Sequence, residues 1–191
     1  MPRNLIFLFL ISCSKVVDIE TFDYLPFKKY QSWTYLDENN NEFNISAIKS
    51  DSFFIILSFE GNLEFLQNTG DFILIKRTIE YSNYDQLIVA YDGNLPYFPY
   101  PFVDGFNKEY VISGKDYFAK TIISIQKEKL NYNLNYYYYE QTPNSKKIIR
   151  RFYKFAPDSF IVYAEIGPDT SIIGSYLSVY NKKVLRILRI E

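Results

Sequence analysis

The only cysteine of the chain, Cys13, is the residue with the clearest chemical use, because its thiol directly follows a short apolar run. Residues 5–11 are uninterrupted apolar side chains, and a single cation, Arg3, precedes them. Such a run extends only about 10 Å as a helix, whereas a helix that crosses a bilayer needs about 20 residues. The segment is therefore typical of a signal peptide, with a charged start and an apolar centre, and not of a transmembrane anchor.

Residues 10–13, Leu-Ile-Ser-Cys, resemble the lipobox of bacterial lipoproteins. The resemblance implies that residues 1–12 are removed as a lipoprotein signal peptide, that the Cys13 thiol is diacylated, and that residues 13–23 form a lipidated tether. Each buried methylene of an acyl chain contributes about 0.8 kcal/mol, so two chains hold a protein stably on a membrane. Ser14 favours the outer membrane, facing the periplasm or the cell surface. The alternatives are an ordinary secretory signal with a chance cysteine, or a buried N-terminal strand.

The chain has no histidine, and this absence restricts its chemistry. It removes the usual general base near neutral pH, the Ser–His and Cys–His nucleophile pairs, and the commonest ligand of transition metals. Once Cys13 is acylated, thiolate chemistry and zinc–thiolate sites are excluded as well. We therefore expect no metal and no cofactor.

Carboxylate pairs are the main route to catalysis that remains. Glycoside hydrolysis needs two carboxylates about 5–10 Å apart beside a cleft. Glu60 and Glu64 flank a turn, and Asp92 and Asp104 bracket a proline-rich segment, but acidic residues at turns are usually solvated. A serine–lysine pair at residues 113–115 is disfavoured because near neighbours on a strand do not face one another. We expect a protein that is not an enzyme, with a carboxylate-dependent hydrolase of cell-wall glycans as an alternative.

Aromatic residues are the main candidates for binding. Trp33 is the only tryptophan, and it either anchors the core or stacks on a ligand. Four tyrosines occupy residues 136–139, and alternation along a strand directs two rings to each face. One pair should lie in the core, and the other should pack across strands or form an exposed patch. The candidate ligand or partner residues are Trp33, Tyr97, Phe98, Tyr100, Tyr137 and Tyr139.

Composition points to one β domain without nucleic-acid binding. The 191-residue chain has 21 basic and 22 acidic residues and no block of like charge, whereas a nucleic-acid binder shows a basic face. Its 19 tyrosines and 17 phenylalanines favour strands, because aromatic side chains pack well on a pleated surface. Without its first twelve residues the chain is still long enough for a single domain with a core.

Alternating apolar residues and turn signals predict the elements that position these candidates. The expected strands are residues 32–36, 42–50, 52–60, 63–67, 72–81, 86–91, 110–113, 117–128, 132–141, 146–155, 159–166, 172–180 and 184–190. Residues 95–102 contain three prolines and are expected to cross between two halves instead of joining the sheet interior. The last strand, with Arg186 and Arg189, is expected at a solvent-exposed edge.

These elements predict an all-β fold with little helix: a single antiparallel, strongly curved sheet or half-barrel of about twelve short strands. The β domain spans residues 24–191. The dipeptide Pro26-Phe27 recurs as Pro101-Phe102, and this limited similarity suggests two related halves, residues 24–94 and 99–191.

Three segments resemble a group of uncharacterised β lipoproteins of the bacterial envelope. Residues 24–35, Tyr-Leu-Pro-Phe-Lys-Lys-Tyr-Gln-Ser-Trp-Thr-Tyr, are similar to the opening Tyr-Phe-Pro-Leu-x-x-Gly-Asn-x-Trp-x-Tyr of that group. Residues 151–158 are similar to its later Tyr-Tyr-Ala-Pro-Gly-Val-Gly turn, and residues 176–180 to its closing strand. The chain departs at Tyr30 and Asp158, where the group has glycine. The resemblance implies a curved antiparallel sheet in the envelope and no established catalytic residues.

The sequence thus predicts a membrane-anchored, non-enzymatic lipoprotein of the cell envelope, held on the membrane by the lipid on Cys13. It is expected to bind an apolar or glycan ligand in the concave face of the sheet, or an envelope protein partner. A structural subunit of an envelope secretion or assembly complex is a further alternative. A hydrolase would show converging carboxylates with one raised pKa, and a carrier would show an apolar cavity. A subunit would show a flat aromatic patch or an open strand edge.

Overall fold

The computed structural model describes residues 30–49, 53–57, 63–84 and 86–190. Cys13, the predicted signal peptide and tether, the first residues of the family-like opening, and Glu60 lie outside these described residues. Within the described ranges the chain forms fourteen strands and no helix, so the predicted all-β fold class is confirmed. The strands are β1 (Tyr30–Leu36), β2 (Glu42–Lys49), β3 (Phe53–Leu57), β4 (Leu63–Asn68), β5 (Phe72–Asn83), β6 (Gln86–Pro99), β7 (Asn107–Ser113), β8 (Phe118–Glu128), β9 (Asn131–Gln141), β10 (Ser145–Ala156), β11 (Phe160–Ile166), β12 (Asp169–Ile173), β13 (Tyr176–Tyr180) and β14 (Lys183–Ile190).

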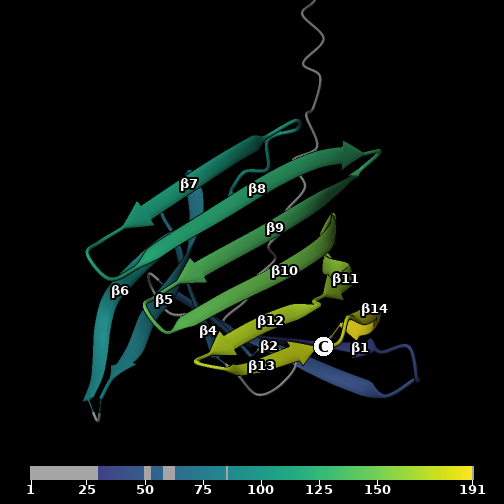
Figure 1. The fold of residues 1–191 in the computed structure, drawn as a ribbon. Helices are drawn as coiled ribbons and strands as arrows, with labels where there is room; N and C mark the ends of the chain where they lie inside the picture. The colour runs from purple at the N-terminus through teal and green to yellow at the C-terminus, as the bar shows by residue number, and fades with distance from the viewer. Residues whose placement is uncertain (1–29, 50–52, 58–62, 85, 191) are drawn as a thin grey trace, which may run out of the picture.

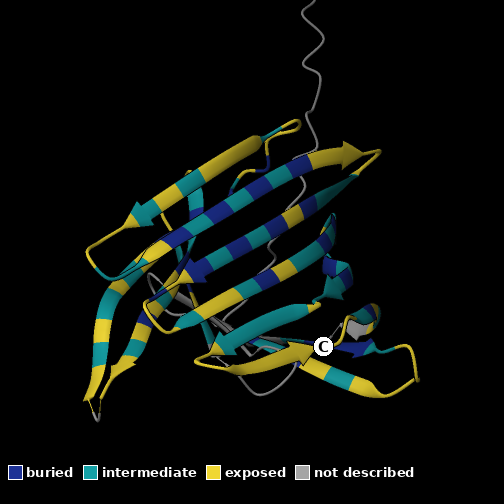
Figure 2. Ribbon diagram, viewed as in Figure 1, coloured by how far each residue is buried: buried dark blue, intermediate teal, exposed yellow. Residues whose placement is uncertain are grey.

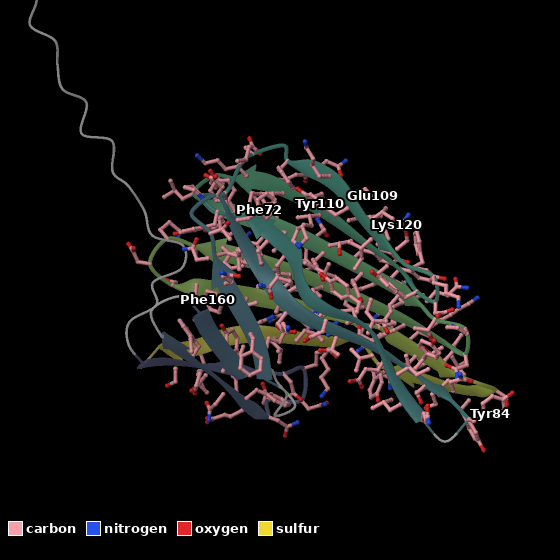
Figure 3. The ribbon with its side chains drawn as sticks, turned by 90° about the vertical axis from the view of Figure 1, so that its left-hand side faces the viewer. Phe72, Tyr84, Glu109, Tyr110, Lys120 and Phe160 are labelled. Atoms are coloured by element: carbon pink, nitrogen blue, oxygen red, sulfur yellow. The ribbon has the colours of Figure 1, made fainter. Side chains whose placement is uncertain are left out.

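All fourteen strands belong to one antiparallel sheet, in the order β6-β5-β4-β3-β2-β1-β14-β11-β10-β9-β8-β7, with β12 and β13 branching from β10. The sheet curves so strongly that its two ends approach each other: β7 to β10 form a broad layer, and β5 and β6 lie behind it (Figure 1). Phe72 of β5 contacts Tyr110 of β7 with ring centroids 5.9 Å apart (Figure 3). Among the described strands no hydrogen-bonded ladder joins β6 to β7, so the curved sheet is not closed.

The core lies on the concave side, and alternation along the strands fills it. In β8 the buried residues are Ala119, Thr121, Ile123 and Ile125, and in β9 they are Leu134, Tyr136, Tyr138 and Glu140. Figure 2 shows this alternation as dark blue bands separated by teal or yellow bands on β8, β9 and β10. Because side chains on a strand alternate between its two faces, the residues between the buried ones face outward.

The proline-rich segment differs from the prediction. Residues 95–99 are not a crossing segment but the last part of β6, whose Gly93 pairs with Arg77 and whose Leu95 pairs with Ile75. Prolines are tolerated here because β6 is the terminal strand of the sheet, where a missing N–H does not break a second ladder. The crossing to β7 is made by residues 100–106 instead.

The last strand also differs from the prediction. β14 is not an edge but an interior strand that pairs with β1 and with β11. Leu185 is fully buried, while Arg186 is exposed. Arg186 therefore lies on the outward face of an interior strand, because alternation shows which face a side chain occupies and carries no information on neighbouring strands.

The two predicted halves occupy different parts of the sheet. Strands β1 to β6 follow one another on one side of the order, and β7 to β14 make up the other side. That the two halves are related in sequence stays a prediction.

A two-stranded arm, made of β12 and β13, leaves the main sheet beside β10. β11 pairs with the second part of β10, and β12 pairs with its first part, Ser145 to Ile148. Between β11 and β12 the chain bends at Gly167, whose φ of +85° is unfavourable for other residues. Side-chain bonds hold the bend, because Arg151 Nη1 lies 2.7 Å from Asp169 Oδ1. The arm is thus fixed to β10 (Figure 1).

Candidate functional site

Three candidate residues, Trp33, Tyr97 and Phe98, lie in the core and not on a surface. Trp33 therefore takes the expected role of a core anchor, whereas the assignment of Tyr97 and Phe98 to a binding surface is wrong. Trp33 of β1 is fully buried and packs on Phe160, with ring centroids 4.6 Å apart. Tyr97 meets Tyr136 edge-on at 4.7 Å across the two layers of the curved sheet. These rings fill the concave side, so they are not accessible to a protein partner.

Tyr100 lies at the rim of this core, in the crossing segment after β6. It is half-buried, and its ring stands edge-on to the buried Phe102 at 5.7 Å. Phe102 in turn packs on Phe155 of β10 at 4.8 Å. The crossing segment therefore covers one end of the concave side with aromatic rings, and Tyr100 belongs to this cover.

The four consecutive tyrosines of β9 divide between the faces as the alternation predicts. Tyr136 and Tyr138 are buried in the core, whereas Tyr137 and Tyr139 are half-buried on the outer face. The prediction that one pair is core is confirmed. The outward pair identifies the part of the surface where aromatic side chains gather.

Cross-strand register builds a continuous outer surface around Tyr137 and Tyr139. Tyr139 lies between Lys120 of β8 and Ile148 of β10, and Tyr137 lies between Ile122 and Arg150. We call this surface the aromatic face; it consists of Phe118, Lys120, Ile122, Tyr137, Tyr139, Ile148 and Arg150. Directly opposed side chains on one face of a sheet are close enough to contact each other, so the seven residues form one patch.

Ring and cation contacts hold the aromatic face in place. Phe118 packs against Tyr139 with ring centroids 6.1 Å apart, and the Arg150 guanidinium lies 5.7 Å from the centre of the Tyr137 ring. The Tyr139 hydroxyl donates a hydrogen bond to Gln141. Both outward tyrosines are therefore held by their neighbours and remain partly exposed.

The charges on and beside the aromatic face are mainly positive. Lys120 pairs with Glu109 of β7 at 3.2 Å (Figure 3). Lys146 lies on the same side, opposite Gln141, and no carboxylate of the described residues forms an ion pair with Lys146 or Arg150. A ligand with apolar groups and carboxylates would complement this surface.

A buried polar cluster crosses the concave side. The Tyr97 hydroxyl donates to the Tyr153 hydroxyl at 3.2 Å, and the Tyr138 hydroxyl donates to Glu140 at 2.8 Å. Arg77 lies 5.7 Å from the centre of the Tyr138 ring. Burial raises the pKa of Tyr97 well above its ordinary value and raises the pKa of Tyr153 to about 12. The cluster is therefore neutral at its tyrosines and joins the two layers of the core.

The carboxylates considered for catalysis are engaged in separate contacts. Glu64 lies 3.9 Å from Arg77, Asp92 pairs with Lys76 at 2.7 Å, and Asp104 accepts a hydrogen bond from the Lys127 backbone at 2.8 Å. The hydrogen bond from Lys76 lowers the pKa of Asp92, which is the opposite of what a general acid requires. Ser113 and Lys115 are both exposed at the end of β7.

The structure does not describe a metal site or a membrane-spanning helix. Among the described residues no group of three or more acidic, cysteine or histidine side chains could hold a metal ion. The described part of the chain has no helix long and apolar enough to cross a membrane.

No family model matches the chain, and neither a curated protein nor a solved structure matches it. The likeness to envelope β lipoproteins therefore stays a prediction.

Sequence reasoning missed most of the aromatic face. Alternation in residues 117–128 does place Phe118, Lys120 and Ile122 on one side of a strand. It does not show that this strand lies beside Tyr137 and Tyr139, because register with a neighbouring strand is set by tertiary pairing. The sequence also predicted a single strand over residues 172–180, where the structure has the end of β12, a turn and the edge strand β13.

Proposed function

We propose that this protein is a lipid-anchored, non-enzymatic binding protein of the cell envelope that holds a protein partner on its aromatic face. The anchor rests on Cys13 and the lipobox-like residues before it. The binding role rests on one observation: Tyr137, beside Arg150, and Tyr139, beside Phe118, lie on the outer face, held by their neighbours and partly exposed.

The outer surface is favoured over the concave side because rings pack the concave side. Phe98, Phe102 and Phe155 contact one another there with centroid separations of 4.8 to 5.7 Å. An apolar or glycan ligand would have to displace these contacts, and a well-packed core resists such insertion. The residues of the aromatic face are exposed or partly exposed, so a partner could contact them without displacing core rings.

A protein partner is favoured by the kind of residues on the aromatic face. Tyrosine, phenylalanine and arginine are enriched at the centres of protein interfaces, and rigid rings lose little conformational entropy on binding. Arg150 and Lys146 would pair with carboxylates of the partner. The partner expected here therefore presents an apolar patch with acidic residues at its rim.

Site-specific photo-crosslinking in the envelope of the host tests this proposal. A benzophenone side chain replaces Tyr139 in one variant and Tyr84 in the control, since Tyr84 is 97% exposed at the β5–β6 turn, outside the aromatic face (Figure 3). We expect one protein to be crosslinked from position 139 and not from position 84. The partner, once identified and purified, should bind the Arg150→Glu variant at least about tenfold more weakly than the wild type.

Other outcomes distinguish the alternatives. Equal crosslinking from positions 84 and 139, or unchanged affinity of Arg150→Glu, would overturn the role of the aromatic face. Crosslinking of a glycan or a lipid at position 139 would show that the aromatic face binds that ligand and not a protein partner. A constant stoichiometry with several envelope proteins would favour the structural-subunit role.

A further inference from the structure

Three described strands pair with only one neighbour, and two of them carry features that prevent pairing with another chain. β6 contains Pro96 and Pro99, which lack the N–H group that a ladder needs. β7 carries the adjacent charges Lys108 and Glu109. Natural sheets use prolines and charged side chains in this way to keep their edges from associating.

The third open edge, β13, has no such protection. Its sequence, Tyr-Leu-Ser-Val-Tyr, contains no charge and no proline, and it pairs with β12 alone among the described strands. All five residues are exposed; Tyr176 is 82% exposed and Leu177 is 62% exposed. An exposed apolar edge strand is a template for the addition of another strand.

The arm that presents β13 is held in place at its base. Asp169 accepts hydrogen bonds from the Arg150 backbone at 3.0 Å and from the Arg151 guanidinium at 2.7 Å. The Gly167 backbone N–H donates to the Arg150 carbonyl at 2.9 Å. The arm is therefore pre-organised, so that binding to its edge does not first require ordering of a loose segment.

The sequence of β13 is complementary to itself in antiparallel pairing. When two copies align about Ser178, Tyr176 lies opposite Tyr180 and Leu177 lies opposite Val179. Each pair joins residues of the same kind, and Ser178 lies opposite its own counterpart on the two-fold axis. This is the symmetry of an isologous interface, in which one patch binds a second copy of itself.

We propose that β13 is the contact strand of a homodimer, and that a second copy of this chain adds to it in antiparallel register about Ser178. Alternate residues of the edge direct their N–H and C=O groups outward, so the pairing forms about four to six interchain hydrogen bonds. Lys182 follows the strand and would lie opposite Gly174 of the second copy, so no like charges face each other. The small contact predicts a weak, concentration-dependent dimer.

β13 shares no residue with the aromatic face, although Arg150 of that face also bonds the Pro168 carbonyl at the base of the arm at 3.1 Å, and the homodimer does not depend on the proposed function. The variants chosen below lie on β13 and not among Phe118, Lys120, Ile122, Tyr137, Tyr139, Ile148 and Arg150. Failure of one proposal therefore leaves the other unaffected.

Disulfide trapping tests the register. In the full chain carrying Cys13→Ser, purified in mild detergent, Ser178→Cys introduces a single thiol on the two-fold axis. Opposed Cα atoms in an antiparallel pair lie about 4.5–5.5 Å apart, within the range of a disulfide. The control is Leu177→Cys, because residue 177 and its counterpart would lie about 8 Å apart, beyond that range. We expect a disulfide-linked dimer with Ser178→Cys and little with Leu177→Cys.

Charge variants test the same pairing without a crosslink. Analytical ultracentrifugation should show that Val179→Lys and Leu177→Glu each weaken self-association by about tenfold or more. An equimolar mixture of the two variants should recover it, because the mixed dimer places the introduced carboxylate of one chain opposite the introduced ammonium group of the other. The matched control is Val111→Lys on the β7 edge, since Val111 and Val179 are 50% and 56% exposed. Val111→Lys should associate like the wild type.

Three results would overturn the homodimer. The first is a wild-type chain that stays monomeric at all concentrations up to about 1 mM. The second is equal crosslinking by Ser178→Cys and Leu177→Cys, which would contradict the proposed register about Ser178. The third is a monomer in which the outward-directed amides of β13, those not bonded to β12, are protected from hydrogen exchange, because another part of the same chain would then cover the edge.

Discussion

The hydroxyl groups of Tyr97 and Tyr153 are hydrogen-bonded to each other at 3.2 Å, although the residues lie on strands at different places in the sheet order. Tyr97 belongs to the terminal strand β6, and Tyr153 belongs to β10. Both residues are buried, with exposed fractions of 5% and 6%. This contact is one of the polar links between the two layers of the curved sheet, where no backbone ladder connects the described strands β6 and β7.

Removal of either hydroxyl should destabilise the fold. Tyr153→Phe leaves the buried Tyr97 hydroxyl without its acceptor, and the expected loss in the free energy of unfolding is about 1–3 kcal/mol. The double change Tyr97→Phe with Tyr153→Phe should cost less than the sum of the single changes, because no unpaired hydroxyl remains. Urea denaturation followed by fluorescence measures these values. Tyr84→Phe is the control, and strict additivity would show that the two hydroxyls do not interact.

Buried tyrosines should make the protein sensitive to alkali. Burial raises the pKa values of Tyr35, Tyr97, Tyr136, Tyr138 and Tyr153. Because these folded-state values lie above the ordinary value near 10, the stability from the neutral hydroxyls is full below pH 10 and falls as the pH rises through the folded values. Spectrophotometric titration at increasing pH should show a cooperative rise in tyrosinate absorbance when the protein unfolds, at a pH above the ordinary tyrosine pKa of about 10. A single transition near pH 10 with the fold intact would contradict this.

Gly167 should be required at the bend between β11 and β12. A methyl group there would lie 3.1 Å from the backbone nitrogen of Asp169 and 3.2 Å from the carbonyl oxygen of Asn181, at a φ of +85°. Gly167→Ala should lower the free energy of unfolding by about 1–3 kcal/mol. Gly174→Ala is the control, because its φ of +58° is also positive but nothing lies within 4 Å. Thermal unfolding should show a clearly larger loss for Gly167→Ala, and equal losses would refute the steric argument.

The anchor predicted from Cys13 is tested by mass spectrometry of the protein purified from its host. The mature N-terminus should begin at Cys13 and carry the mass of a diacylated cysteine. Cys13→Ser should be neither acylated nor retained on membranes. An unmodified Cys13, or cleavage at another position, would contradict the lipoprotein assignment.

The sequence by itself determined most of the strand positions and which side chains of a strand share a face, although it missed residues 95–99 of β6 and the turn between β12 and β13. Residues 132–141 illustrate this, since alternation alone divides Tyr136 and Tyr138 from Tyr137 and Tyr139, as the structure has them. The absence of helix from the described residues could be predicted for the same reason: the apolar residues recur with the two-residue period of a strand, and the many aromatic side chains suit a pleated surface.

Only the tertiary structure decided which strands are neighbours, and therefore which edges remain open. Nothing in the local pattern of β14 shows that it lies between β1 and β11, and nothing in that of β13 shows that it has one partner among the described strands. The buried Trp33 packs on Phe160, which lies far along the chain. Alternation is a property of a single strand, whereas register, edge position and burial by distant segments arise from pairing between strands that are remote in sequence.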